Sequence, residues 1–232
     1  MKDTVYSKYI KRILDIICAL AAIIVFCWLY VILIVLGLIF MRGNPFFVQE
    51  RPGKDEKIFK MLKFRTMDNS RDSDGNLLPD KERVNKYGRF LRATSLDELP
   101  EAFNILIGDM SVVGPRPQLV RDMVFMTDEQ RKRHTVRPGL SGLAQVNGRN
   151  DIDWEEKFEW DLVYIKDITF GGDLKIVLKT VKQAFFKREG AVVGNLSTAE
   201  DFGDYLLSRG KVDQSTYDQK QESAKELLNT RG

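Results

Sequence analysis

Residues 94–117 have the sequence TSLDELPEAFNILIGDMSVVGPRP, which contains the features that best predict the fold. Apolar residues recur in it at spacings of four and three, which is typical of one face of a short amphipathic helix: Leu99, Phe103 and Leu106. Pro100 has no backbone N–H and is tolerated only in the first turn of a helix. The helix is therefore predicted to begin near residues 96–98.

Two adjacent carboxylates, Asp97 and Glu98, fall at this predicted helix start. The positive end of the helix dipole favours their ionised forms and also attracts phosphate. The same residues fit a capping box with Ser95 as the N-cap, which is a purely structural alternative. The stiff turn at 114–117 brings Arg116 back towards the carboxylates after a helix too short to be explained by core packing. This combination favours phosphoryl chemistry.

The central stretch resembles the signature of the bacterial sugar transferase family, the monotopic polyprenyl-phosphate phosphoglycosyl transferases. The similarity continues through RPGKDEKIFKMLKFRTM at 51–67 and RPGLSGLAQVNGRN at 137–150, and it covers residues 8–190. The resemblance implies an enzyme that moves a sugar phosphate from a UDP-sugar to a polyprenyl phosphate such as undecaprenyl phosphate, and releases UMP. It also implies that Asp97 and Glu98 are the family's catalytic dyad.

From the resemblance, Asp97 is expected to attack the β-phosphate and form a covalent phosphosugar intermediate. Asp97 and Glu98 are also expected to bind Mg²⁺, because two anionic substrates need countercharge. Glu98 is assigned either to the metal or to steering the acceptor phosphate. The expected substrate-binding residues are cationic or amide side chains in the matching motifs: Lys63, Arg65, Arg92, Arg116, Arg137, Gln145, Asn147 and Arg149. For Arg92, a plain role at the C-terminal end of its helix is the alternative.

Two other functions stay open at this point. The same dyad could activate water in a membrane-bound, Mg²⁺-dependent hydrolase of nucleotide-sugar pyrophosphates. The chain could also be a catalytically silent membrane anchor that binds nucleotide sugars, although intact Asp97, Glu98 and Arg116 argue against this. A net charge of +3 in 232 residues does not favour nucleic acid as a partner, and the single histidine, His134, excludes paired-histidine metal sites.

Residues 16–41 contain no charged side chain, a run of 26 residues, and about 20 suffice to cross a bilayer as a helix. Both flanks of the run are basic, which favours a re-entrant hairpin with both ends in the cytoplasm. The family resemblance implies the same topology through a Ser-Pro pair, but Cys27-Trp28 stands here, with no proline in residues 1–44. A continuous spanning helix is therefore the alternative. Asp15 is expected to pair with Lys11 or Arg12 one turn back.

The remaining segments are predicted from hydrophobic periodicity and turn residues. A β-hairpin is expected from Pro45–Gln49 and Lys57–Phe64, and a loop at 68–83. Helices are expected at Val84–Ala93, Gln118–Thr135, Asp151–Lys166, Asp173–Arg188 and Tyr217–Leu228. The helix at 173–188 is basic and amphipathic, so it fits either a membrane surface or the protein core. The C-terminal tail is expected either to pack on the domain or to remain mobile.

The predicted fold class is α+β, predominantly helical with a small β-hairpin, and associated with a membrane through its N-terminal helix and amphipathic surface helices. The predicted division is a membrane-inserted helix at 1–43, a catalytic domain at 44–190 and a polar tail at 191–232. The expected location is the bacterial inner membrane with the catalytic domain facing the cytoplasm. The expected partners are a UDP-sugar, a polyprenyl phosphate and the lipid bilayer. The sequence leaves open which sugar is used and whether the chain forms a homo-oligomer.

Overall fold

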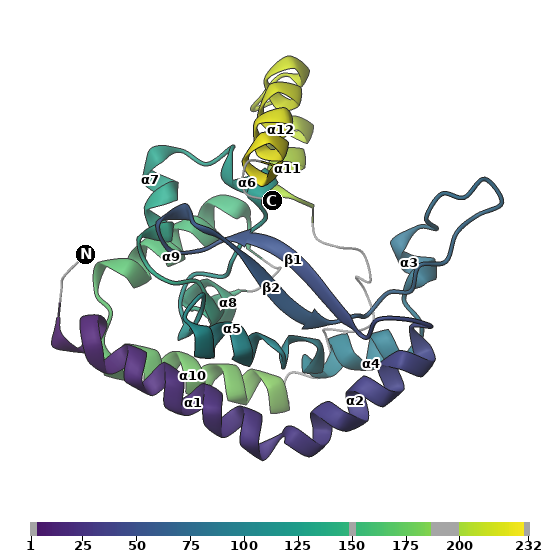
Figure 1. Cartoon of the computed structure of the whole chain (residues 1–232). Coiled ribbons are helices and arrows are strands. Elements are labelled where there is room, and N and C mark those ends of the chain that lie inside the picture. Colours follow the sequence, from purple (N-terminus) through teal and green to yellow (C-terminus); the bar gives the residue numbers. More distant parts are fainter. Residues whose placement is uncertain (1–3, 149–151, 187–199, 230–232) are drawn as a thin grey trace.

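The computed structural model describes residues 4–148, 152–186 and 200–229. The described chain is mostly helical, with one antiparallel and one parallel pair of short strands (Figure 1). The prediction of a predominantly helical α+β fold with a small hairpin is confirmed. A bent pair of long helices forms one side of the molecule, and the hairpin crosses its middle (Figure 1).

The N-terminal apolar run forms two helices rather than one. A π-helical turn at Tyr6–Ile10 leads into α1, Lys11–Val25, and α2 follows at Cys27–Phe40. No single helix among the described residues is long and apolar enough to cross a bilayer, but this pair meets the test together and is bent by 64°. The break is at Phe26, directly before Cys27-Trp28. The sequence therefore does not form one straight, continuous helix, and the bend occurs without a proline.

The bend follows from where each arm of the pair packs. α1 packs on α5, Glu101–Ile107, and on strand β3, Ser111–Val113, whereas α2 packs on α4, Lys86–Thr94. The outer faces of both arms are apolar and exposed, for example at Ile17 and Trp28. Tertiary contacts on one face thus replace the helix-breaking proline that the resemblance led us to expect.

The helix pair α1 and α2 carries one acidic residue, Asp15, and both cysteines of the chain. The expected pairing of Asp15 with Lys11 or Arg12 is wrong. Asp15 is buried and accepts hydrogen bonds from Ser111 Oγ at 3.0 Å and from the Val112 backbone N–H at 2.9 Å. Lys11 pairs with Asp173 instead. Cys18 and Cys27 are free and exposed.

The predicted hairpin is present and slightly longer than expected. β1, Phe46–Pro52, pairs antiparallel with β2, Ile58–Phe64, in a register that places Phe46 opposite Phe64. The RPGKDE turn forms a 3₁₀ turn at Lys54–Glu56. The predicted loop at 68–83 ends in a single helical turn, α3, Asp80–Arg83, before α4 begins. The hairpin and the helix predicted at Val84–Ala93, which corresponds to α4, are confirmed, while the helical turn α3 was predicted as loop.

A second pair of strands was not predicted. β3 pairs in parallel with β4, Gly139–Ser141, so that Ser111 lies opposite Gly139. The backbones approach closely here, and a Cβ atom on Gly139 would lie 2.0 Å from the Gly114 nitrogen. The sequence pattern could not reveal strands of three residues, because an alternation of about four residues or more is needed to identify a strand.

The single helix predicted at Gln118–Thr135 is wrong. The segment forms α6, Val120–Met123, then α7, Asp128–Arg131, and a 3₁₀ turn at Lys132–Thr135. Thr127 caps the start of α7, because its Oγ1 accepts the Gln130 N–H while the Gln130 side chain accepts the Thr127 N–H. The capping box thus restarts the helix after a break that hydrophobic spacing alone did not show.

The C-terminal half adds five helices to the described chain. They are α8 at Leu143–Asn147, α9 at Trp154–Lys166, α10 at Phe170–Phe186, α11 at Phe202–Ser208 and α12 at Gln214–Asn229. The helices predicted near α9, α10 and α12 are confirmed, while residues 187–188 lie outside the described part. α11 and α12 pack on the domain: Phe202 contacts Phe158, and Ala224 lies in a cluster with Met123. The tail therefore packs on the domain over residues 200–229.

α10 uses two faces in different ways. Ile176 is buried and Val177 is packed against the same cluster. Leu174, Leu178 and Val181 are exposed on the other side of the helix. The helix thus packs on the core with one edge, as one of the two predictions had it, and presents an apolar strip outward with the other. The contact of this strip with a membrane surface stays a prediction.

Candidate active site

The acidic pair lies in a corner between two helices. α4 ends at Thr94, and Ser95 adopts a left-handed conformation with φ of 55°. A 3₁₀ turn at Leu96–Glu98 follows, and α5 begins only after Pro100. The helix therefore starts later than predicted, because Pro100 forms its N-cap rather than its first turn. Ser95 makes no capping hydrogen bond, which excludes the capping-box alternative.

Glu98 is held by two cations from different parts of the chain. Its Oε1 atom lies 2.7 Å from Arg116 Nη2 and 3.1 Å from Lys63 Nζ. Lys63 comes from β2, and Arg116 from the turn that follows β3. The predicted approach of Arg116 to the acidic pair is thus confirmed, and Lys63 joins it.

Glu101 is a third carboxylate in this cluster and was not predicted. Its Oε1 atom lies 3.0 Å from Lys63 Nζ, so Lys63 bridges Glu98 and Glu101. Glu101 is 2% exposed, and burial raises the pKa of its carboxyl group. A spacing of three residues from Glu98 places both acids on one side of the helix start, and this was the available signal.

Asp97 and Glu98 differ strongly in acidity although they are neighbours. Burial and the charge of Glu98 raise the pKa of Asp97 to about 6. For Glu98, burial acts in the same direction, but Arg116 and Lys63 outweigh it and lower its pKa to about 2. The dipole argument predicted the opposite shift for Asp97, because it ignored desolvation. Asp97 is still mostly ionised at neutral pH, and it is the more basic of the two carboxylates.

Buried groups behind the site fix the turn that carries Arg116. Arg133 Nη2 donates to the Arg116 carbonyl oxygen at 2.6 Å and to Asp161 Oδ2 at 2.7 Å. The side chains of Arg133 and Asp161 are 1% and 4% exposed. Arg51 donates to the Pro117 carbonyl at 3.3 Å, and burial beside Arg116 lowers the pKa of Arg51 to about 10. In the sequence Arg133 stands in a run of basic residues, 131–133, which is more typical of a solvated face, but the structure buries its side chain.

Those of the other predicted substrate-binding residues that the structure describes form no hydrogen bond or ion pair with the acidic pair. Arg92 donates from Nε to Thr66 Oγ1 at 3.0 Å, and Arg65 directly follows β2. Arg137 donates to the Gly108 carbonyl at the far end of α5, 2.8 Å away. In α8, the Gln145 amide donates to the Leu140 carbonyl and the Asn147 amide oxygen accepts from Lys179. Arg149 lies outside the described residues. The ligand-binding roles of these residues stay predictions.

The acidic pair offers oxygen ligands of the kind that Mg²⁺ prefers. Neither carboxylate oxygen of Asp97 has a side-chain partner in the described structure, and Glu98 uses only Oε1 in its ion pairs. No group of three or more His, Cys, Asp or Glu side chains that could hold a metal occurs among the described residues. Mg²⁺ is commonly held by one or two carboxylates together with substrate phosphates, so a pair is a sufficient protein contribution.

The sequence matches a family of known proteins over most of its length. The family model described as "Bacterial sugar transferase" matches residues 6–187, which include the whole acidic cluster. The chain belongs to the bacterial sugar transferase family. The resemblance carried by residues 94–117 is therefore confirmed, and as a family member the protein is a transferase.

Several bacterial relatives share the family. An uncharacterized sugar transferase, EpsL of Bacillus subtilis, is 45% identical over 195 residues, which are 83% of this chain and 95% of that protein. The UDP-glucose:undecaprenyl-phosphate glucose-1-phosphate transferase of Klebsiella pneumoniae is 43% identical over 63% of this chain and 34% of its own. The undecaprenyl-phosphate galactose phosphotransferase of Salmonella typhimurium is 35% identical over 80% of this chain and 42% of its own. This sugar transferase thus spans nearly all of EpsL and less than half of the two longer relatives.

Proposed function

We propose that this sugar transferase moves a sugar phosphate from a UDP-sugar to undecaprenyl phosphate and releases UMP, as an early membrane step of polysaccharide synthesis. Relatives named for this reaction support its general form. The observation that carries the proposal is the contrast within the acidic pair. In the described structure no side chain binds the carboxylate of Asp97, whose pKa is raised to about 6, while Glu98 is fixed by Arg116 and Lys63.

Asp97 acts as the nucleophile. A carboxylate oxygen of Asp97 attacks the β-phosphorus of the UDP-sugar, and the bond from that phosphorus to the bridging oxygen breaks. The leaving UMP takes the bonding electrons, and the sugar phosphate stays on Asp97 as an acyl phosphate. A raised pKa makes Asp97 the more basic carboxylate and hence the better nucleophile, and Arg116 and Lys63 counter the charge of the arriving phosphates.

The acceptor completes the reaction in a second displacement. A phosphate oxygen of undecaprenyl phosphate attacks the phosphorus of the intermediate, and the Asp97 carboxylate leaves with the bonding electrons. The products are a polyprenyl diphosphate sugar and free enzyme. Glu98 does not compete with Asp97 as the nucleophile. Its carboxylate is bound by Arg116, and its pKa of about 2 makes it a weak nucleophile.

Asp97 and the second oxygen of Glu98 are the residues that would hold Mg²⁺. The ion, when bound, neutralises charge on the pyrophosphate. The unpaired oxygens of the acidic pair support this assignment. Arg116 and Lys63 both bind Oε1 of Glu98, so its Oε2 has no ion-pair partner among the described residues.

The lipid substrate requires a membrane location, and we propose a re-entrant insertion of α1 and α2 into the inner membrane from its cytoplasmic side. The bend of 64° and the apolar outer faces of both arms support this topology. The exposed apolar strip of α10, at Leu174, Leu178 and Val181, is flanked by Lys175 and Lys182 and fits the membrane surface. The acidic pair would then lie near the headgroup layer, where a polyprenyl phosphate is reached.

The reaction is tested by UMP release from a panel of UDP-sugars. The full chain, reconstituted in lipid nanodiscs with Mg²⁺, is assayed with and without undecaprenyl phosphate. Asp97→Asn is the test variant, and Glu159→Gln is the matched control because Glu159 is exposed on α9. We expect one sugar to give continuous UMP release with lipid, and a burst of about one UMP per enzyme without it.

Each alternative outcome has its own meaning. Continuous UMP release without lipid would indicate the hydrolase, and nucleotide-sugar binding without turnover would indicate the silent anchor. Equal activity of Asp97→Asn and Glu159→Gln would exclude Asp97 as the nucleophile.

A further inference from the structure

A cavity lined in part by basic side chains lies where the first turns of the N-terminal helix meet the globular domain. It has a volume of about 70 Å³. One water molecule needs about 10–15 Å³ of such space, so the cavity has room for a group of several atoms. We propose that this cavity is a phosphate-binding site, separate from the acidic pair, formed by Arg12, Lys54 and Arg137.

The lining of the cavity is strongly cationic. Four basic side chains line it, Lys11, Arg12, Lys54 and Arg137, against one acidic side chain, Asp15. Asp15 accepts hydrogen bonds at Oδ1 from the Ser111 hydroxyl and the Val112 N–H, but these neutral donors do not cancel its charge, so it offsets one of the four cations. The cavity therefore offers an excess of positive charge to a bound group.

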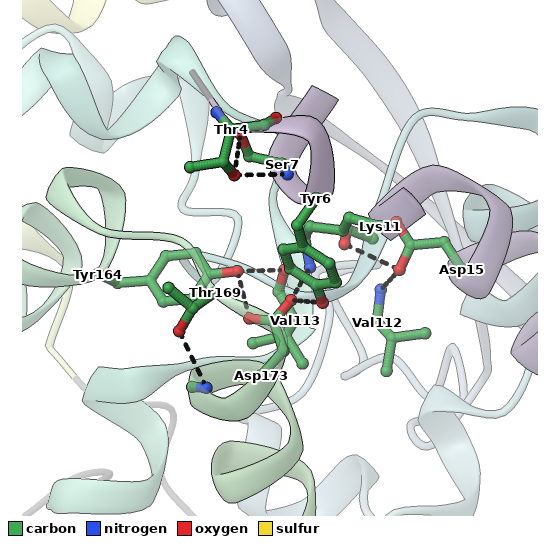
Figure 2. Close-up of polar contacts among 12 residues, drawn as sticks. Thr4, Tyr6, Ser7, Lys11, Asp15, Val112, Val113, Tyr164, Thr169 and Asp173 are labelled. Atoms are coloured by element: carbon green, nitrogen blue, oxygen red, sulfur yellow. Dashed lines mark hydrogen bonds and ion pairs between the residues drawn. The ribbon is translucent and has the colours of Figure 1, made fainter. Parts of the chain in front are cut away.

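Asp173 neutralises only one of these cations. Its Oδ2 atom accepts from Lys11 Nζ and from the Tyr6 hydroxyl, both at 2.7 Å. Its Oδ1 atom lies 2.9 Å from the Tyr164 hydroxyl. Figure 2 shows Tyr6, Lys11 and Tyr164 converging on Asp173, with Asp15 bonded separately to Val112. Arg12, Lys54 and Arg137 form no direct ion pair with a carboxylate in the described part of the chain, although Asp15 acts on Arg12 through space.

Arg12 and Arg137 lie close enough to repel each other through space. Arg12 donates to the Ile105 carbonyl at 2.6 Å and to the Leu106 carbonyl at 2.9 Å, and Arg137 donates to the Gly108 carbonyl. These acceptors lie at the C-terminal end of α5, where the helix dipole supplies only about half a negative charge. Asp15 and the helix end together supply about one and a half negative charges, which is less than the two guanidinium charges, so an anion between them would be stabilised.

The free donors fit a tetrahedral oxyanion. Arg137 uses Nε for the Gly108 carbonyl, and its Nη1 and Nη2 groups have no hydrogen-bond partner within the described residues. A guanidinium edge matches two phosphate oxygens at once. Lys54, exposed at the turn of the hairpin, adds a mobile ammonium group at the rim.

The position of the cavity separates it from the proposed reaction. It lies at the C-terminal end of α5, whereas Asp97 precedes the N-terminal end of this helix. The outer face of α1 beside it is apolar and exposed at Ile13 and Ile17. A phosphate bound here is either the headgroup of an anionic lipid at the membrane surface or free inorganic phosphate.

The test measures binding to the full chain in detergent by calorimetric titration with two probes, dihexanoyl phosphatidylglycerol and inorganic phosphate. Lys54→Glu is the test variant. Lys57→Glu is the matched control, because Lys57 is an exposed lysine of the same hairpin that does not line the cavity. We expect Lys54→Glu to weaken binding at least about tenfold and Lys57→Glu to leave it unchanged.

The probe that binds more tightly identifies the source of the phosphate group. If neither probe saturates the wild-type protein by about 10 mM, the cavity is not a phosphate site. Binding that both variants weaken equally, or that Lys54→Glu leaves unchanged, would place the phosphate elsewhere and overturn the proposal. None of these outcomes depends on turnover, so the result is independent of the proposed transferase reaction.

Discussion

At the scale of single residues, the pH dependence of the reaction follows from Asp97. Burial and Glu98 raise the pKa of Asp97 to about 6, and only its carboxylate form attacks phosphorus. The ionised fraction falls about tenfold for each pH unit below this pKa. We expect the rate of the UMP burst to be constant above about pH 7 and to fall below about pH 6. Single-turnover measurements across this range test the prediction.

Two variants should shift the acidic limb of the pH profile, which is the fall in rate below about pH 6, in opposite directions. Arg116 lowers the pKa of Asp97 and Glu98 raises it, so Arg116→Gln should move the limb to higher pH and Glu98→Gln to lower pH. Arg116→Gln should also slow the burst about 10²–10³-fold, the usual effect of removing one group that stabilises transition-state charge. Single-turnover pH profiles of both variants measure these shifts. A limb that stays in place in both variants would show that another group titrates.

Asp97 also lowers the stability of the folded protein at neutral pH. Because its folded pKa lies above its unfolded value of 3.8, folding loses stability as pH rises from about 4 to about 6. Asp97→Asn removes this loss, so we expect the variant to be more stable by roughly 1–3 kcal/mol at pH 7.5. The difference from wild type should vanish below about pH 4. Thermal unfolding against pH, with Glu159→Gln as the control, measures this difference.

The sequence predicted the residues of this site better than their electrostatics. Asp97, Glu98 and Arg116 stand out because a motif carries them. Glu101 does not, because its role depends on Lys63 from a distant strand. Arg133 looked like part of a surface charge run, and only the fold reveals the buried carboxylate that it contacts.

At the scale of secondary-structure elements, α9 supports the turn that presents Arg116. Asp161 on α9 pairs with Arg133, and Arg133 binds the Arg116 carbonyl. Asp161→Asn leaves a buried guanidinium without its charge partner, which typically costs 3–5 kcal/mol of stability. We expect a double variant, Arg133→Met with Asp161→Leu, to be more stable than Asp161→Asn, because no unpaired charge remains. Chemical denaturation of both variants tests this order.

The double variant also separates stability from positioning. Without Arg133, the Arg116 carbonyl loses its hydrogen-bond donor, and Arg116 is no longer held beside Asp97 and Glu98. We therefore expect a slower UMP burst, and a fall in rate that begins at higher pH because Arg116 lowers the pKa of Asp97. Both effects should occur even if the double variant unfolds at the same denaturant concentration as the wild type. An unchanged pH profile in a stable double variant would show that Arg133 serves packing alone.

The long helices and the hairpin were predictable because the spacing of their apolar residues repeats over most of each element. The apolar spacing of segment 118–135 fits one helix. However, the buried Asp122 carboxylate accepts hydrogen bonds from the Leu119 and Phe202 backbone N–H groups. The capping box at Thr127 then starts a second helix. Such breaks come from tertiary hydrogen bonds, which a periodic pattern does not contain. The same holds for the bend at Phe26, where two packing partners act instead of a proline.

At the scale of the whole molecule, both arms of the bent helix pair are bonded to the same domain. In the first arm, Lys11 pairs with Asp173 of α10. In the second arm, the Tyr30 hydroxyl donates to the Leu99 carbonyl at 2.7 Å. Because these contacts come from one globular domain, the two arms approach it from the same side. This argues for a re-entrant hairpin, which the sequence left open against a spanning helix.

The topology is tested by cysteine labelling at the two ends of the helix pair. Lys8→Cys and Gly43→Cys are made one at a time in a background of Cys18→Ser and Cys27→Ser, since both native cysteines are exposed. Both new positions are exposed, and a side chain at Gly43 meets no atom closer than 3.9 Å. We expect a membrane-impermeant maleimide to label neither variant in intact spheroplasts and both in inverted vesicles. Labelling of Lys8→Cys alone in spheroplasts would mean that the chain crosses the bilayer, and the bond between Lys11 and Asp173 could then not form in the membrane.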